Sequence, residues 1–282
     1  MTKFDGKTIA FIGAGKLGET LIKGMLDAGL VGREQIVATV QHNSSVTRVR
    51  EKLGVEAGTD NREAVQKADI VVIAVKPQAI HLLLNELRDL MTPEQVLISV
   101  VASVPLKILE AGLQNQVPVI RAMPNTPSRV TAGMTAICAG RYAEDRHLEQ
   151  ADMIFSSVGR VLRLDEKHFD AVTGLSASGP AFIYIIIESL AEGGVKAGLP
   201  RDVATELAAQ TCLGAAKMVM ETGEHPAVLK DLVTTPAGCT IDGILKLEEG
   251  GVRVTLIKAI VEAAGRARTL IEDAENGSAC CG

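Results

Sequence analysis

The sequence predicts an α/β protein in which a doubly wound sheet is followed by an all-α domain. Three observations carry this prediction. Short β-branched runs alternate with helical patterns over the first 165 or so residues, and strand-like alternation is absent after residue 166. A glycine-rich turn also joins the first strand pattern to the first helical pattern. Near-continuous apolar strands separated by helices are typical of a parallel sheet that is buried on both faces.

The first part of the chain contains the predicted strands. They cover residues 7–12, 35–40, 68–75, 96–102, 118–124 and 135–140. Helical spacing of apolar residues predicts helices over 18–28, 44–52 and 80–90. This alternation is expected to give an N-terminal domain over residues 1–165.

The second part of the chain reads as helical throughout. Helices are expected over 169–173, 179–197, 201–222, 226–232, 240–249 and 252–274, with breaks at glycine and proline between them. Residues 166–275 are therefore expected to form a helical domain, and residues 276–282 a disordered tail. Since these helices are apolar on nearly all sides, we expect a partner subunit to cover them.

Composition excludes several classes of function. Aromatic residues make up 2% of the chain, tryptophan is absent and the net charge is −5, which argues against binding of nucleic acid. The most apolar stretch, 181–187, ends at Glu188 and is far shorter than the roughly 20 residues of a membrane span. Because the first predicted strand begins at residue 7, we expect no signal or transit peptide. The five cysteines show no metal-ligand spacing, so we expect a cytoplasmic protein with reduced thiols and no metal site.

Residues 13–18 form a G-x-G-x-x-G pattern between a strand and a helix. Gly13 allows a tight turn, Gly15 lets the backbone approach a pyrophosphate, and Gly18 lets the helix pack close to the sheet. The helix N-terminus offers free N–H groups to the phosphates. This context indicates a Rossmann-type dinucleotide site, and the alternative is a glycine turn without a ligand.

The end of the second strand indicates which dinucleotide binds. An NAD site usually places an acidic residue about 20 residues after the glycines. This chain instead has Gln41, His42 and Asn43, with no acid before Glu51, and Arg48 is close enough in sequence to accept a 2′-phosphate. NADPH is therefore favoured and NADH is the alternative, because neutral residues also tolerate it. His42 has a second interpretation as a solvated loop histidine.

The first long helix of the second domain lacks an obvious acid. Hydroxyacid dehydrogenases of this build often place a lysine there. In this chain the segment 174–181 leads into the helix, and no lysine follows before Lys196. A ketone would lack its proton donor, but a protonated imine is already an electrophile for hydride. The pattern therefore favours an imine substrate.

Four segments of the chain resemble a known family. GLSASGPAFIY, HPAVLKDLVTTPAGCTIDGILKLEEGG, RAMPNTP and AVKP look like the signature segments of pyrroline-5-carboxylate reductase. The resemblance runs from about Thr8 to Leu270. It implies NAD(P)H-dependent reduction of 1-pyrroline-5-carboxylate to L-proline. It also implies a homodimer of intertwined helical domains, often assembled into larger rings.

The resemblance also implies a role for each matching residue. Asn61 would lie near the adenosine phosphate end, Asn125 within 123–127 would border the nicotinamide, and Glu166 would meet the substrate. Lining the cofactor would be Ile12, Gly13, Ala14, Gly15, Lys16, Leu17, Ala74, Val75, Lys76 and Pro77, with Val100, Val101 and Ala102 beside the nicotinamide ribose. The chain departs from the family at Ser103 and Ala237, where relatives often have glycine.

The segment 232–243 provides the expected substrate site. Ala237, Gly238, Cys239 and Thr240 open a helix, and the N–H groups of the last three are expected to be free for a substrate carboxylate. Pro236 favours extended geometry before it and Gly238 is expected to relax the backbone. The Thr240 hydroxyl is expected to orient the imine nitrogen, which makes Thr240 the candidate catalytic residue. The alternatives are a helix cap without a ligand here and a solvated surface residue at Glu166.

Two other functions fit parts of this pattern. One is a related reductase for a hydroxyacid or another cyclic imine, which the missing lysine and the threonine loop oppose. The other is a catalytically silent dinucleotide sensor or scaffold, which would be expected to have lost the substrate loop. Cofactor oxidation with pyrroline-5-carboxylate, compared with keto-acid controls, separates the three.

Overall fold

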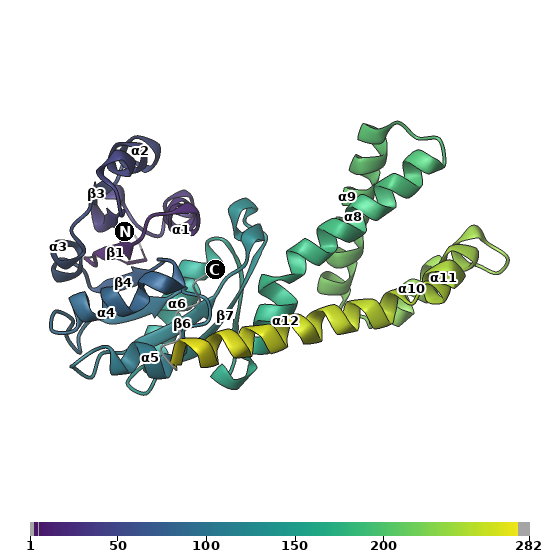
Figure 1. Cartoon of the computed structure of the whole chain (residues 1–282). Helices are drawn as coiled ribbons and strands as arrows, with labels where there is room; N and C mark the ends of the chain where they lie inside the picture. The colour runs from purple at the N-terminus through teal and green to yellow at the C-terminus, as the bar shows by residue number, and fades with distance from the viewer. Residues whose placement is uncertain (1–2, 5, 276–282) are drawn as a thin grey trace. The chain divides into compact units, whose positions relative to one another are not determined.

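A computed structural model describes residues 3–4 and 6–275 of the chain (Figure 1). The contacts within it define two compact units. Among the described residues, one unit contains 3–4, 6–177 and 263–275, and the other contains 178–262. The domain boundary placed at 165/166 from the change in sequence pattern stays a prediction. The tail expected over 276–282 lies outside the described residues.

The first unit is built on an eight-stranded sheet. Its strands are β1 (Ile9–Ile12), β2 (Ile36–Thr39), β3 (Glu56–Gly58), β4 (Ile70–Ile73), β5 (Val96–Ser99), β6 (Val119–Met123), β7 (Gly133–Ala139) and β8 (Gly159–Arg163). They lie in the order β3-β2-β1-β4-β5-β6-β7-β8. The first six positions of this order are those of a doubly wound dinucleotide-binding sheet, as predicted.

Helices cover both faces of this sheet, so its central strands are buried on both sides. One face carries α1 (Lys16–Asp27), α2 (Asn43–Leu53) and α6 (Asp145–Ser156). The other carries α3 (Asn61–Gln66), α4 (Ile80–Leu87), α5 (Leu106–Ala111) and α7 (Phe169–Val172). Strand β1 supplies Ile9 and Phe11 to the first core and Ala10 and Ile12 to the second.

The sheet differs from the prediction at one edge. Strands β6 and β7 pair antiparallel, with Arg121 opposite Cys138, whereas a parallel sheet was expected. The connection between them contains only the 3-10 turn η3 (Thr126–Val130) and is too short for a crossover. The short strand β3 and the edge strand β8 were not predicted. Neither shows the long apolar run that marked the other strands.

The second unit is helical, as predicted. It contains α8 (Gly179–Lys196), α9 (Arg201–Thr222), α10 (Pro226–Val233) and α11 (Cys239–Glu249), and α12 (Val252–Glu275) begins within it. Ala191 of α8 packs with Ala204 and Ala208 of α9 in the core of this unit. Many larger apolar side chains on all five helices are exposed to solvent instead.

Candidate active site

The residues expected at the cofactor lie after the carboxyl ends of neighbouring strands. Ile12 ends β1, residues 74–77 follow β4, residues 100–102 follow β5 and Asn125 follows β6. Gln41, His42 and Asn43 are exposed after β2, with His42 as the N-cap of α2. Strands β1 and β4 are neighbours although β2 and β3 separate them in sequence, which makes their ends the topological switch point. Ligands of doubly wound sheets bind at this point.

The glycine-rich turn has the backbone that the pattern predicts. Gly13 has φ +96°, and a Cβ there would lie 2.9 Å from the backbone oxygen of Ala74. A Cβ at Gly18 would lie 2.7 Å from the backbone oxygen of Gly13, so α1 approaches the turn closely. At Gly15, by contrast, a Cβ would meet nothing within 4 Å. The turn thus has no room for a side chain at Gly13 or Gly18, but it is open at Gly15, where a pyrophosphate can approach the backbone.

The start of α1 can accept this phosphate. Gly15 is the N-cap and provides no side-chain cap, so the amides of the first turn are available to an anion. Lys16 is exposed at the first helical position. Residues 12–17 therefore fit the dinucleotide that was predicted for them.

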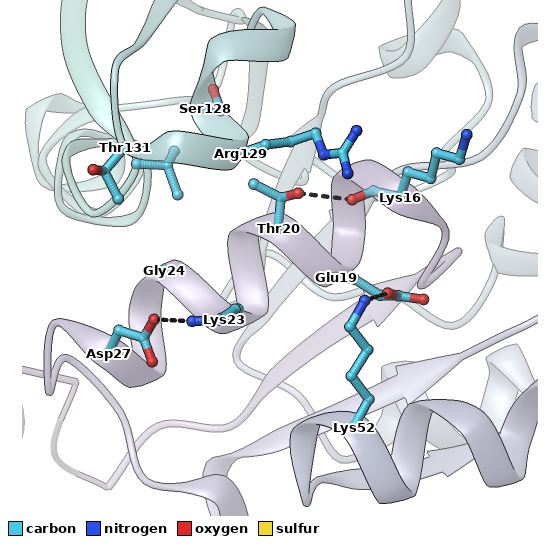
Figure 2. A pocket seen from close by; sticks show the side chains of 11 residues that line it. Lys16, Glu19, Thr20, Lys23, Gly24, Asp27, Lys52, Ser128, Arg129 and Thr131 are labelled. Atoms are coloured by element: carbon cyan, nitrogen blue, oxygen red, sulfur yellow. Dashed lines mark hydrogen bonds and ion pairs between the residues drawn. The ribbon is translucent and has the colours of Figure 1, made fainter.

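The expected 2′-phosphate region contains an ion-pair network that the sequence did not reveal. Glu19 of α1 pairs with Arg48 and, at 2.7 Å, with Lys52, both on α2. Burial opposes the ionisation of Glu19, but hydrogen bonds from Lys52 and Arg48 outweigh it and hold the pKa of this carboxyl below its usual value. Figure 2 shows Lys52 reaching from α2 to the Glu19 carboxylate. A cavity of about 320 Å³ borders this network along α1 and extends to Lys16 and Arg129.

Asn61 also has protein partners. Its Oδ1 accepts a hydrogen bond from the Thr39 hydroxyl at 2.7 Å, and its Nδ2 donates to Glu86 at 3.0 Å. Asn61, the first residue of α3, thus joins the end of β2 to α4. This contact fixes its amide at the edge of the sheet where the adenosine end was predicted.

Asn125 ties the end of β6 to an irregular helical turn. Its Nδ2 donates to the carbonyl oxygen of Ser176 at 3.2 Å and to the Ser176 hydroxyl at 3.3 Å. Its Oδ1 accepts from the backbone N–H of Met134 at 2.9 Å. Ser176 lies in a π-helical turn, Thr173–Ala177, and such turns are frequent at functional sites.

Glu166 is held in place by a buried arginine. Its Oε1 accepts from Arg121 at 2.8 Å and from the backbone N–H of Leu106 at 2.7 Å. The Arg121 guanidinium also lies 4.7 Å from the ring centroid of Phe169. Burial and the nearby Glu166 raise the pKa of the adjacent Cys138 thiol to about 12. Glu166 is therefore not a freely solvated residue, since its side chain is only 33% exposed.

Arg121 was missed as part of this site. Its signal was a single arginine within the apolar run 118–124, where a buried charge requires a partner.

The threonine loop forms a β-turn before α11. The N–H of Gly238 donates to the carbonyl oxygen of Thr235 at 3.1 Å, Pro236 is the second residue of the turn, and Ala237 is the third with φ +57°. This is the geometry of a type II turn. One expectation was therefore wrong, because the Gly238 N–H closes the turn and is not free. The left-handed residue of the turn is Ala237, whereas Gly238 has φ −81°.

The N-terminus of α11 remains open despite this correction. Gly238 is its N-cap and has no side chain to satisfy the first turn. The amides of Cys239 and Thr240 are first-turn donors at the positive end of an 11-residue helix. Thr240 is half-buried beside the exposed Cys239. The loop can therefore hold a carboxylate next to a hydroxyl group.

Two family models match the chain. One, described as pyrroline-5-carboxylate reductase dimerisation, matches residues 166–270. The other, described as NADP oxidoreductase, coenzyme F420-dependent, matches residues 8–103.

Similar proteins cover nearly the whole chain. A pyrroline-5-carboxylate reductase of Methanosarcina acetivorans is 44% identical, over 94% of this chain and 98% of its own length. The Arabidopsis thaliana enzyme is 44% identical, over 93% of this chain and 95% of its own length. A solved pyrroline-5-carboxylate reductase from Coxiella burnetii has a TM-score of 0.88 at 35% identity and covers 94% of this chain and 99% of its own. The Plasmodium falciparum structure with NADP bound has a TM-score of 0.84 at 28% identity and covers 95% and 99%.

Proposed function

Because this chain belongs to the pyrroline-5-carboxylate reductase family, we propose that the start of α11 holds the carboxylate of 1-pyrroline-5-carboxylate during reduction. The chain is an NAD(P)H-dependent oxidoreductase that forms L-proline in the final step of proline biosynthesis. The observation that carries the proposed site is the uncapped helix start directly after the type II turn.

The first unit holds the cofactor through residues 12–17 and the strand ends that surround them. When bound, the reduced nicotinamide supplies hydride to the imine carbon. The amides of α1 position the pyrophosphate, and residues 74–77 and 100–102 form the adjoining wall. Asn125 supports the nicotinamide side through its contact with the π-helical turn. Each of these roles concerns binding and orientation, which supply much of the rate enhancement of hydride transfer.

The substrate loop supplies two distinct contacts. The amides of Cys239 and Thr240 donate hydrogen bonds to the carboxylate, and the type II turn keeps Ala237 and Gly238 beside it. The Thr240 hydroxyl oxygen accepts a hydrogen bond from the iminium N–H and so orients the C=N bond for hydride. Glu166, fixed by Arg121, provides a carboxylate for the substrate's cationic group. The reaction then needs no strong general acid, since the iminium is already electrophilic.

The assembly we propose is a homodimer formed through the helical domain of residues 166–275, and a ring of dimers is compatible with it. The matching dimerisation model and the exposed apolar helices support this assignment. The described helical segment Glu166–Lys196 is long and apolar enough to cross a membrane by length and composition. We assign this segment to the dimer instead, because the dimerisation model covers it, and we place the protein in the cytoplasm.

Substitution of Thr240 tests the proposed substrate site. Thr240→Ala should reduce kcat about 100-fold or more, because the iminium loses the hydroxyl group that orients it for hydride transfer. The dissociation constant for NADPH should stay within about twofold of the wild-type value, since no cofactor contact is removed. Steady-state oxidation of NADPH measures kcat, and fluorescence titration measures cofactor binding.

Thr240→Ser serves as the matched control because it keeps the hydroxyl and removes only a methyl group. This variant should recover most of the lost rate. An alanine variant with wild-type kcat would remove Thr240 from the mechanism. A serine variant as slow as the alanine variant would show that the methyl group, rather than the hydroxyl, is required.

A further inference from the structure

Glu19 forms the electrostatic link between the first two helices of the sheet domain. Its side chain is only 8% exposed, and its two oxygens are occupied separately. Oε1 accepts from Arg48 and Oε2 accepts from Lys52 at 2.7 Å. Both cations are about half-exposed, so they remain reachable from the solvent side of the network.

The two cations belong to a stripe on α2 that starts at the expected ribose site. Ser44, Arg48 and Lys52 are spaced four residues apart, so they lie on one face of the helix. Ser44 is in the first turn of α2, five residues after Thr39, which ends β2. In a doubly wound dinucleotide site, this strand end meets the adenosine ribose, and a nearby arginine accommodates the 2′-phosphate of NADPH. Arg48 is the arginine one turn from that position.

Arg48 is therefore not a free cation in this protein. A 2′-phosphate carries a charge of about −1.5 to −2 near neutral pH, so it is attracted by Arg48 and repelled by Glu19. The carboxylate cancels part of the charge that would otherwise distinguish NADPH from NADH. NADH has hydroxyl groups at this ribose and is almost unaffected by the balance.

We infer that Glu19 is a residue that sets cofactor specificity, lowering the preference for NADPH over NADH by partly neutralising Arg48 and Lys52. The inference rests on the proposed dinucleotide site and adds a determinant outside the glycine-rich turn and the β2 end. The contact between α1 and α2 affects cofactor binding because Arg48 and Lys52 interact with both Glu19 and the 2′-phosphate.

The test is Glu19→Gln in the full-length protein, with dissociation constants for NADPH and NADH measured by fluorescence titration at low salt. Glutamine keeps the size and one acceptor oxygen but removes the negative charge. NADPH should bind about tenfold more tightly, while the affinity for NADH changes less than about twofold. The gain should shrink as ionic strength rises.

Asp27→Asn is the matched control. Asp27 also lies on α1 and pairs with Lys23, so the variant changes the net charge by the same amount about 12 Å farther along the helix. Its ratio of NADPH to NADH affinity should equal that of the wild type. Arg48→Met should lower that ratio, and adding Glu19→Gln to Arg48→Met should raise it less than in the wild-type background.

Equal changes in both affinities for Glu19→Gln would show a purely structural link and overturn the inference. An equal change in the ratio of NADPH to NADH affinity in Asp27→Asn would show that net charge alone causes the effect, and this would also overturn the inference. Failure of the wild-type protein to bind either dinucleotide would contradict the proposed function itself, so the two failures are distinguishable.

Discussion

Ala237 is held in a conformation that alanine rarely adopts. Its φ of +57° is required by the third position of the type II turn, where glycine is usual, and left-handed geometry costs an L-residue about 1–2 kcal/mol. Ser103, with φ +59°, is a second such residue, beside the expected nicotinamide ribose. At both positions the resemblance to the family implies a glycine. Thr131, with φ +58° at the end of η3, is the third described non-glycine residue with positive φ, so two of the three lie in loops that are expected to face the reacting molecules.

Ala237→Gly should stabilise the fold by about 0.5–1 kcal/mol, because the released strain exceeds the added entropy of the unfolded chain. Urea unfolding measures the change. Ala215→Gly, at an exposed position within α9, is the control and should destabilise the protein by about 1 kcal/mol. A loss of stability in Ala237→Gly comparable to that control would contradict the assignment of strain.

His147 makes stability depend on pH. It is buried at the start of α6, and its Nδ1 accepts the backbone N–H of Glu144 at 2.9 Å. Burial, followed by the charge of Arg146, lowers the pKa of His147 below 6.5. The unfolded state therefore binds the proton more readily, so this contribution is complete above about pH 6.5 and is lost as pH falls towards the folded pKa.

The expected result is a lower urea midpoint at pH 5 than at pH 7.5. In His147→Gln, which retains an acceptor for the amide, this part of the pH dependence should disappear. If the urea midpoint depends on pH in the same way in the wild type and in His147→Gln, other groups cause the acid sensitivity.

At the scale of elements, the Asn125 contact joins the end of β6 to the π-helical turn. Asn125→Asp keeps the acceptor for Met134 but removes both hydrogen bonds donated to Ser176. It should destabilise the protein by about 1–3 kcal/mol, because the Ser176 carbonyl then faces a carboxylate. Ser176→Ala removes only the hydroxyl contact and should cost about 1 kcal/mol or less. Urea unfolding measures the loss in free energy of unfolding for each variant. Equal losses in the two variants would contradict the importance of the hydrogen bond to the Ser176 carbonyl.

The elements that the sequence predicted are those with strong local signals. The glycine turn, the apolar strands and the long helices from α8 onward carry periodicity or punctuation that local physics explains. Arg201–Thr222, for example, is bounded by Pro200 and by Gly223, which has φ +68°. Strand β3 has three residues and gains its structure by pairing with β2. The direction of β7 and the π-helical turn likewise depend on packing between distant segments.

The same division applies to the candidate site. Residues within one motif, such as 12–17 and 237–240, were identified because their chemistry is contained in a short segment. Glu19 and Arg121 act on partners 29 and 45 residues away, so no local pattern marks them. The Gly238 amide was wrongly expected to be free, because its hydrogen bond to the Thr235 carbonyl closes the turn. Hydrogen-bond closure of a turn is a property of the folded loop.

At the scale of the whole molecule, the helical unit exposes more apolar surface than a stable monomer in water normally does. Apolar side chains are exposed on every helix that contributes to it, including Ile185 on α8, Leu213 on α9, Leu232 on α10, Leu245 on α11 and Ile257 on α12. Monomeric proteins rarely expose apolar patches larger than a few hundred Å². Only the pair α8 and α9 forms a small buried core within the unit. A second copy of the chain is the partner that the family assignment supplies.

Leu213→Glu tests this assembly, since the side chain is 60% exposed in the single chain and should be buried in the dimer. A charge placed in an apolar interface without a partner costs several kcal/mol, so the variant should dissociate into monomers or aggregate. Light scattering after size-exclusion chromatography measures the mass. Leu82→Glu is the control, because Leu82 is 76% exposed on α4 of the sheet domain and should leave the dimer intact. A Leu213→Glu protein that remains a wild-type dimer would show that α9 lies outside the interface, and the exposed face of that helix would then require a different partner.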